Sequence, residues 1–142
     1  MNIKRLLLAI VAGMLFIFAS DFLIHALWLD ADYKATASLW RPEPEMQQRF
    51  AWMLMAQLLC AVAFAVIWAK GFADRDLGTG AFFGFFMGVA SQVWAIAFFV
   101  VAPLPGTIAG KWFLSGLLQA TILGVIIAAI YKSDVVRMDR GD

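Results

Sequence analysis

Residues 80–101 have the sequence GAFFGFFMGVASQVWAIAFFVV, which contains no Asp, Glu, Lys or Arg. A helix needs about 20 apolar residues to cross a bilayer core, and this stretch is long enough. Three further stretches are also long enough, so that the predicted spans cover about residues 6–29, 50–69, 80–101 and 112–131. Lipid offers no partner to an unpaired backbone amide, and the alternating pattern of a barrel is absent. The sequence therefore predicts an all-α integral membrane four-helix bundle with short loops, in a single domain over residues 1–142.

The composition also indicates that the bilayer is the solvent. The chain has 142 residues, of which 63% are hydrophobic and 15% charged, and its mean hydropathy is +0.83. About half apolar is usual for a soluble domain. A net charge of +1 gives no basic surface for nucleic acid. The single cysteine, Cys60, excludes an intrachain disulfide and a multi-cysteine metal site, and its thiol is expected to be buried and inert. The expected partner is the lipid bilayer, with no metal, cofactor or nucleic acid.

Lys and Arg residues predict the orientation, because cytoplasmic loops carry an excess of them. With both termini inside, the cytoplasmic face carries Lys4, Arg5, Lys70, Arg75, Lys132, Arg137 and Arg140. The outer face carries only Lys34, Arg41, Arg49 and Lys111. The start of the chain resembles a secretory signal, but its apolar character resumes after Asp21, so an uncleaved first span is expected. These patterns predict a multi-pass plasma-membrane protein with both termini in the cytoplasm.

The longest connection, residues 30–48, is predicted to carry a short interfacial helix within residues 31–39. Pro42 and Pro44 would end that helix. Glu43 and Glu45 would then lie at the positive N-terminus of the second span.

Most of the six tryptophans lie close to predicted helix ends, where an indole keeps its ring in lipid and its N–H in water. This interfacial belt is predicted to contain Trp28, Trp40, Trp52, Trp68 and Trp112. Trp94 lies deeper, and it either packs in the core or contacts a bound molecule.

Small residues at four-residue spacing predict helix-packing seams, because they let two backbones approach closely in lipid. The third span carries Gly80, Gly84 and Gly88, and the fourth carries Gly116 and Gly124. The seam of the third span meets either the fourth span or a second copy of the chain, so a homo-oligomer or a larger membrane complex remains an alternative.

Each predicted span contains a polar side chain, although polar groups are costly in hydrocarbon and usually face the bundle interior. They are Asp21, His25, Gln57, Gln92 and Gln119. Asp21 and the three glutamines each lie eight or nine residues from the predicted outer end of their span, which is about 12 Å deep at about 1.5 Å per residue. We therefore expect one buried polar layer. Its glutamines either hydrogen-bond between helices and specify assembly or contribute to a ligand site.

Asp21 needs a partner, a proton or water, because an ionised carboxylate at this depth costs at least about 2.5 kcal/mol. His25, the only histidine, follows four residues later on the same helical face and is the expected partner. The pair either satisfies both groups structurally or handles a proton or a ligand. Axial ligation of haem or chlorophyll by His25 is a further alternative. One His, one Asp and the distant Cys60 do not make a zinc or copper site.

Two segments and the third span carry a resemblance to a known group. The segments HALWLDADY at residues 25–33 and LWRPE at residues 39–43, with the glycine-spaced third span, resemble small bacterial four-span membrane proteins classed as a domain of unknown function. The resemblance covers most of the chain. It implies an all-helical fold in the bacterial inner membrane, and it transfers no activity and no site residues.

The sequence contains no nucleophile elbow, phosphate loop, CxxC pair or HExxH motif, which removes support for conventional hydrolase, kinase and thiol oxidoreductase activities. The leading hypothesis is a non-enzymatic membrane protein whose polar layer binds a small ligand or stabilises assembly with a partner. The alternative is a small proton-linked transporter or channel that uses Asp21 and His25. A third hypothesis is a membrane enzyme or cofactor-bearing subunit that uses His25.

Overall fold

The computed structural model describes residues 2–132, and these residues form helices connected by short loops. In chain order the elements are α1 (Ile3–Asp21), the π-helix η1 (Phe22–Trp28), α2 (Asp30–Ala35), the 3-10 helix η2 (Ala37–Leu39), α3 (Glu43–Gln48), α4 (Phe50–Gly71), α5 (Leu77–Val101) and α6 (Gly106–Ile130). Four helical stretches are long and apolar enough to cross a membrane: Ile3–Trp28, Phe50–Gly71, Leu77–Val101 and Gly106–Ile130. The predicted all-α, four-span architecture is confirmed.

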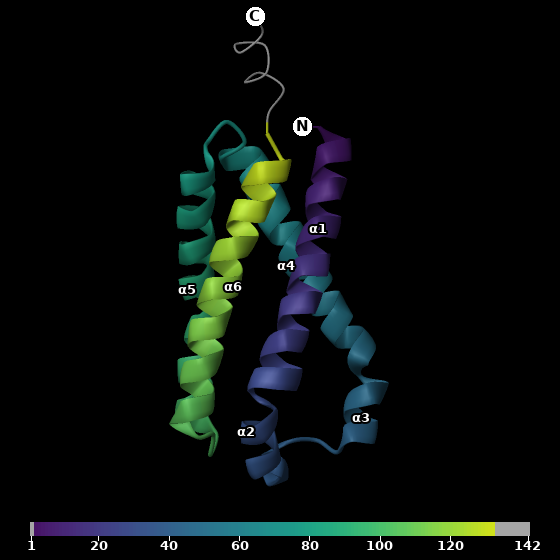
Figure 1. The fold of residues 1–142 in the computed structure, drawn as a ribbon, viewed down its shortest axis with the longest axis vertical. Helices are drawn as coiled ribbons and strands as arrows, with labels where there is room; N and C mark the ends of the chain where they lie inside the picture. The colour runs from purple at the N-terminus through teal and green to yellow at the C-terminus, as the bar shows by residue number, and fades with distance from the viewer. Residues whose placement is uncertain (1, 133–142) are drawn as a thin grey trace, which may run out of the picture.

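The four long helices alternate in direction, so that both described ends of the chain lie at one end of the molecule (Figure 1). There the backbone N–H of Asn2 donates to the hydroxyl of Tyr131 over 3.1 Å. We call this the terminal end. The opposite end, the loop end, carries α2, α3 and the turn between α5 and α6 (Figure 1). Arg137 and Arg140, which contributed to the predicted charge asymmetry, lie outside the described residues.

The long helices do not contact one another equally. The α5–α6 hairpin makes the most extensive contact, and α1 packs against both α4 and α6. Near the terminal end α4 also meets α5 through aromatic rings, because Phe83 contacts Phe64 and Trp68. Toward the loop end α4 runs away from α5 and α6 (Figure 1). The bundle is therefore closed at its terminal end and open at its loop end.

Glycines make the close α5–α6 contact possible within one chain. A Cβ on Gly84 would meet the backbone of Ala120 and would lie 2.9 Å from the Cα of Thr121. A Cβ on Gly124 would lie 2.8 Å from the Cα of Gly84, and one on Gly80 would lie 2.9 Å from the carbonyl oxygen of Gly124. Backbone atoms cannot move aside as a flexible side chain can, so only glycine allows this helix separation. Gly88 is in the same row and faces Leu117 and Ala120.

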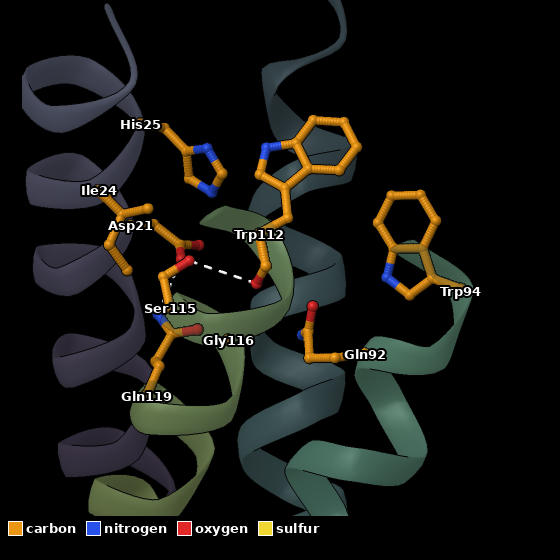
Figure 2. A pocket seen from close by; sticks show the side chains of 9 residues that line it. All are labelled: Asp21, Ile24, His25, Gln92, Trp94, Trp112, Ser115, Gly116 and Gln119. Carbon is orange, nitrogen blue, oxygen red and sulfur yellow. Dashed lines mark hydrogen bonds between the residues drawn. The ribbon is translucent and has the colours of Figure 1, made fainter. Parts of the chain in front are cut away.

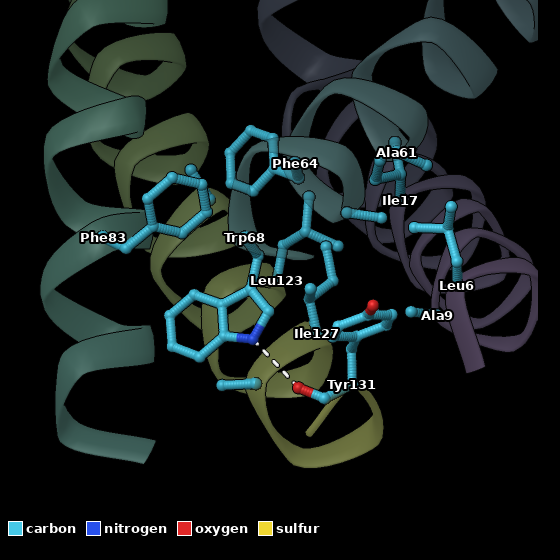
Figure 3. Packing of buried hydrophobic residues seen from close by; sticks show 13 residues of the cluster. Leu6, Ala9, Ile17, Ala61, Phe64, Trp68, Phe83, Leu123, Ile127 and Tyr131 are labelled. Atoms are coloured by element: carbon cyan, nitrogen blue, oxygen red, sulfur yellow. Dashed lines mark hydrogen bonds between the residues drawn. The ribbon is translucent and has the colours of Figure 1, made fainter. Parts of the chain in front are cut away.

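An apolar core fills the terminal half between α1, α4, α5 and α6 (Figure 3). Trp68 lies at its centre with an exposed fraction of 0%, and its indole N–H donates to the carbonyl oxygen of Tyr131 over 3.0 Å. Its placement in an interfacial belt was therefore wrong. The tryptophan is near the end of α4, but the neighbouring helices extend past it and cover its ring.

Two predicted boundaries near the loop end were also wrong. The fourth span begins at Gly106 rather than at Trp112, because Pro105 precedes the helix as its N-cap and the chain becomes helical immediately after it. Glu43 and Glu45 lie in the first turn of the separate helix α3, not at the start of α4. Pro44 is tolerated there because the first turn of a helix does not need its backbone N–H.

Candidate functional site

Asp21 is the last residue of α1, and its carboxylate receives one amide on each oxygen. The side-chain N–H of Gln57 on α4 donates to Oδ2 over 2.7 Å, and that of Gln119 on α6 donates to Oδ1 over 2.8 Å. Gln119 Nε2 also donates to the hydroxyl of Ser20 over 2.7 Å. Three helices therefore converge on one carboxylate.

These amides leave the charge of Asp21 uncompensated. In the part of the chain that the structure describes, Asp21 forms no ion pair with a Lys, Arg or His side chain. Neutral amides orient and solvate a carboxylate, but they carry no positive charge to balance it. A proton or a bound cation would balance the negative charge of the ionised carboxylate.

The helix changes its winding immediately after Asp21. Residues Phe22–Trp28 form the π-helix η1, and the backbone N–H of Leu29 donates to the carbonyl oxygen of Ile24 over 2.9 Å, five residues back. π-Helical segments are rare, and they occur frequently at functional sites because the extra residue in a turn changes where side chains point. Here the segment carries His25.

His25 takes part in a hydrogen-bonded chain that does not include Asp21. Its Nδ1 lies 2.6 Å from the hydroxyl of Tyr33, and the indole N–H of Trp112 donates to that same hydroxyl over 2.8 Å. An indole nitrogen only donates, so the hydroxyl oxygen of Tyr33 accepts from Trp112, whereas the direction of its bond with His25 Nδ1 depends on the tautomer of the imidazole. No hydrogen bond or ion pair joins His25 to Asp21, which removes the expected direct pairing.

A cavity of about 270 Å³ lies between η1, α5 and α6 and is bounded by Asp21 (Figure 2). We call it the Asp21 cavity. Figure 2 shows the His25 ring and the Trp112 indole facing one another across it, with Gln92 and Trp94 on the α5 side. Its walls are Asp21, Ile24, His25, Gln92, Trp94, Trp112, Ser115, Gly116 and Gln119. At about 30 Å³ per water, this volume holds a small organic molecule or several waters.

A second hollow lies on the other side of Asp21, between η1 and α4. It has a volume of about 370 Å³ and we call it the α4 groove. Its walls are Phe18, Asp21, Phe22, His25, Ala26, Phe50, Met53 and Gln57. Asp21 and His25 therefore belong to both hollows, one with a mixed polar and apolar lining and one with a mostly apolar lining.

The remaining predicted residues line the cavity without touching the carboxylate. Gln92 has no hydrogen bond to Asp21, and its amide packs against Gly116, where a Cβ would collide with it. Trp94 is 50% exposed and its ring lies 5.6 Å from that of Trp112, centroid to centroid.

Cys60 is exposed on α4, so the expectation of a buried thiol was wrong. No group of three metal-ligating side chains occurs among residues 2–132.

Tyr33, Trp112 and Ser115 are site residues that the sequence analysis missed. Tyr33 belongs to α2, in the connection where the sequence predicts a short interfacial helix outside the spans. Trp112 was placed at a helix end, because the fourth span was predicted to begin there. In the structure Trp40 contacts the rings of Tyr33 and Trp112, a tertiary contact that no sequence pattern signalled.

The segment from α2 to η2 covers the loop end of the α5–α6 hairpin and holds Tyr33 over the cavity. Lys111 of α6 forms a half-buried ion pair with Asp32 of α2 at 2.7 Å, and its ammonium lies 5.3 Å from the centre of the Trp28 ring. Burial raises the pKa of the Tyr33 hydroxyl above its ordinary value of 10.0, partly offset by the hydrogen bond from Trp112. Tyr33 is therefore a neutral hydroxyl at physiological pH.

Comparison of the chain with protein-family models, with curated proteins and with solved structures finds no match.

Proposed function

We propose that this multi-pass membrane protein binds a small, positively charged ligand in the Asp21 cavity. The observation that supports this most is the carboxylate of Asp21, which two neutral amides hold in place and no described cation balances. Trp94 and Trp112 add aromatic rings to the same walls, and such rings attract cations. A carboxylate with indole rings beside it favours a cation over an anion or a neutral sugar.

The experiment compares the wild-type protein with Asp21→Asn in phosphatidylcholine nanodiscs. Asparagine has nearly the shape of aspartate and keeps one acceptor oxygen, but it has no charge. Methylammonium, acetate and acetamide are titrated separately, and thermal unfolding is followed. Methylammonium should stabilise only the wild-type protein, by about 2.7 kcal/mol at 100 times its Kd. Equal stabilisation of both proteins, or none of either, would overturn the proposal.

A proton-linked transporter or channel is the second candidate, because Asp21 and His25 line both the cavity and the groove. The apolar core of the terminal half weighs against it, because buried hydrophobic side chains fill the space between the helices there. The discriminating measurement is pH-driven flux into proteoliposomes. Flux that disappears in Asp21→Asn would favour transport, and flux unchanged by that substitution would remove Asp21 from the mechanism.

We also propose a bacterial inner-membrane location with the terminal end in the cytoplasm. An excess of basic residues at the terminal end supports its placement in the cytoplasm. These residues are Lys4, Arg5, Lys70, Arg75 and Lys132, with Arg137 and Arg140 beyond the described residues. The Asp21 cavity would then lie in the outer half of the membrane. Cysteine labelling of a Ser38→Cys variant in a Cys60→Ala background, with a membrane-impermeant maleimide on intact cells, tests this orientation. Ser38 is exposed on η2, so it should react before the cells are broken.

A further inference from the structure

The α4 groove is too apolar to serve the same purpose as the Asp21 cavity. Apart from Asp21, His25 and Gln57, its walls are hydrocarbon or aromatic: Phe18, Phe22, Ala26, Phe50 and Met53. The last two are 46% and 56% exposed, so the groove opens on the side where α4 leaves the bundle. In a membrane this side faces the acyl chains.

Gln57 supplies an unmet hydrogen-bond acceptor at the polar end of this groove. Its side chain is 6% exposed, and it is the only buried polar or charged residue among those that the structure describes. Its Nε2 donates to Asp21 Oδ2, but its buried Oε1 has no partner. Leaving such an acceptor unpaired costs about 1–3 kcal/mol. A ligand that pairs with this oxygen must therefore donate a hydrogen bond.

Charge narrows the choice of donor. Asp21 Oδ2 lies beside Gln57, so a donor that reaches both oxygens also meets an uncompensated negative charge. An alcohol donates one hydrogen bond and has no charge, whereas a primary ammonium donates three and is positive. Of these two donors, only the ammonium satisfies both oxygens and the charge.

Combining these observations, we propose that the protein binds protonated primary alkylamines. The ammonium group of these longer amines lies on the α4-groove side of the Asp21 carboxylate, beside Gln57, rather than in the Asp21 cavity, and the alkyl chain occupies the α4 groove after entry from the bilayer. This inference rests on the proposed function, because it assumes that Asp21 binds a cation, and it adds the chemical class of the ligand and the hollow that receives its apolar part.

The test measures binding of radiolabelled octylammonium and methylammonium to the protein in phosphatidylcholine nanodiscs, with empty nanodiscs as the baseline for partition into lipid. Affinities are referred to the free amine in water, from which each buried methylene gains about 0.8 kcal/mol, so octylammonium should bind at least about tenfold more tightly than methylammonium. Octanol, which has the same chain without the charge, should bind at least about tenfold more weakly than octylammonium.

Two substitutions test whether the alkyl chain of the ligand lies in the α4 groove. Ala26→Phe fills the groove and should weaken octylammonium binding about tenfold while leaving methylammonium binding unchanged. Ala63→Phe is the matched control, because Ala63 is exposed on α4 and lines neither the cavity nor the groove, and it should change neither affinity. Asp21→Asn should abolish binding of both amines.

The possible failures are distinguishable. Binding of methylammonium that depends on Asp21, with no gain from the octyl chain, would overturn the alkylamine inference and leave the proposed function standing. Octylammonium binding that survives Asp21→Asn would depend on the alkyl chain alone and would overturn the inference. Absence of binding by either amine would overturn the proposed function itself. The comparison of octylammonium with methylammonium uses the wild-type protein, so it does not depend on whether the Ala26→Phe variant folds.

Discussion

Gln119 donates its side-chain N–H to Asp21 Oδ1 over 2.8 Å, although 98 residues separate them in the sequence. Gln119→Met keeps the length of the side chain and removes the donor. Because the carboxylate then loses one of its two amides, the free energy of unfolding should fall by about 1–2 kcal/mol. Reversible unfolding in mixed micelles measures this. Gln92→Met is the control, since Gln92 does not contact Asp21, and a comparable loss there would show that the glutamines act only through packing.

The glycine seam gives a second prediction. Gly84→Ala should separate α5 from α6 and destabilise the protein by about 1–3 kcal/mol, because its Cβ would meet the backbone of Ala120 and Thr121. Gly110→Ala is the matched control within α6, where nothing lies within 4 Å of the added carbon. It should leave stability unchanged or raise it by about 0.5–1 kcal/mol through helix propensity. Both follow from thermal unfolding in one detergent, and an equal effect of the two would contradict the packing described above.

The terminal-half core gives a third prediction. Trp68→Phe removes a buried N–H that bonds to the carbonyl oxygen of Tyr131, and it leaves a void beside Phe83. The two effects together should lower the free energy of unfolding by about 2–3 kcal/mol. Trp52→Phe, at a side chain that is 73% exposed, should change it by less than about 0.5 kcal/mol. Similar values for the two variants would place Trp68 at the surface.

Tyr33 makes the contact between the α2 segment and the bundle sensitive to alkaline pH. The pKa of its hydroxyl is raised above 10.0 when the segment is docked, chiefly by burial. The neutral hydroxyl therefore stabilises docking fully below about pH 10, and this contribution is lost as the pH rises through the raised pKa. The chain has two tyrosines, so tyrosinate absorbance of the wild-type protein minus that of Tyr33→Phe isolates this residue. A midpoint at or below pH 10.0 would show that the Tyr33 hydroxyl is not buried in the folded protein.

Hydrophobic length was enough to predict the spans, because a bilayer imposes one requirement on every helix that crosses it. The level of the polar groups was also visible in the sequence, and the structure joins Asp21 to two of the three glutamines that share it. Gln92 does not join them. Its side chain points to Gly116, and the spacing along one helix carries no information on which neighbour a side chain meets.

The partner of His25 was not predictable from helical spacing. The i, i+4 relation with Asp21 assumes a regular α-helix, whereas the chain adopts a π-helix from Phe22 onward. Hydrophobicity does not distinguish these two windings, because the segment Phe22–Trp28 is mostly apolar whichever winding it adopts. Tyr33 is the partner instead because α2 docks on the bundle, where Asp32 pairs with Lys111 from a distant part of the chain.

The placement of Gln119 on the last span has a consequence for biosynthesis. Ribosomes deliver the spans in sequence, so Asp21 enters the translocon long before α6 exists. Gln57 arrives with α4, and the second amide arrives only when the fourth span is released into lipid. Until then one carboxylate oxygen lacks its amide, and an ionised carboxylate at the helix centre costs at least about 2.5 kcal/mol. Nascent chains truncated before residue 106 should therefore engage insertion chaperones for longer than the complete chain does, and Asp21→Leu should shorten that engagement.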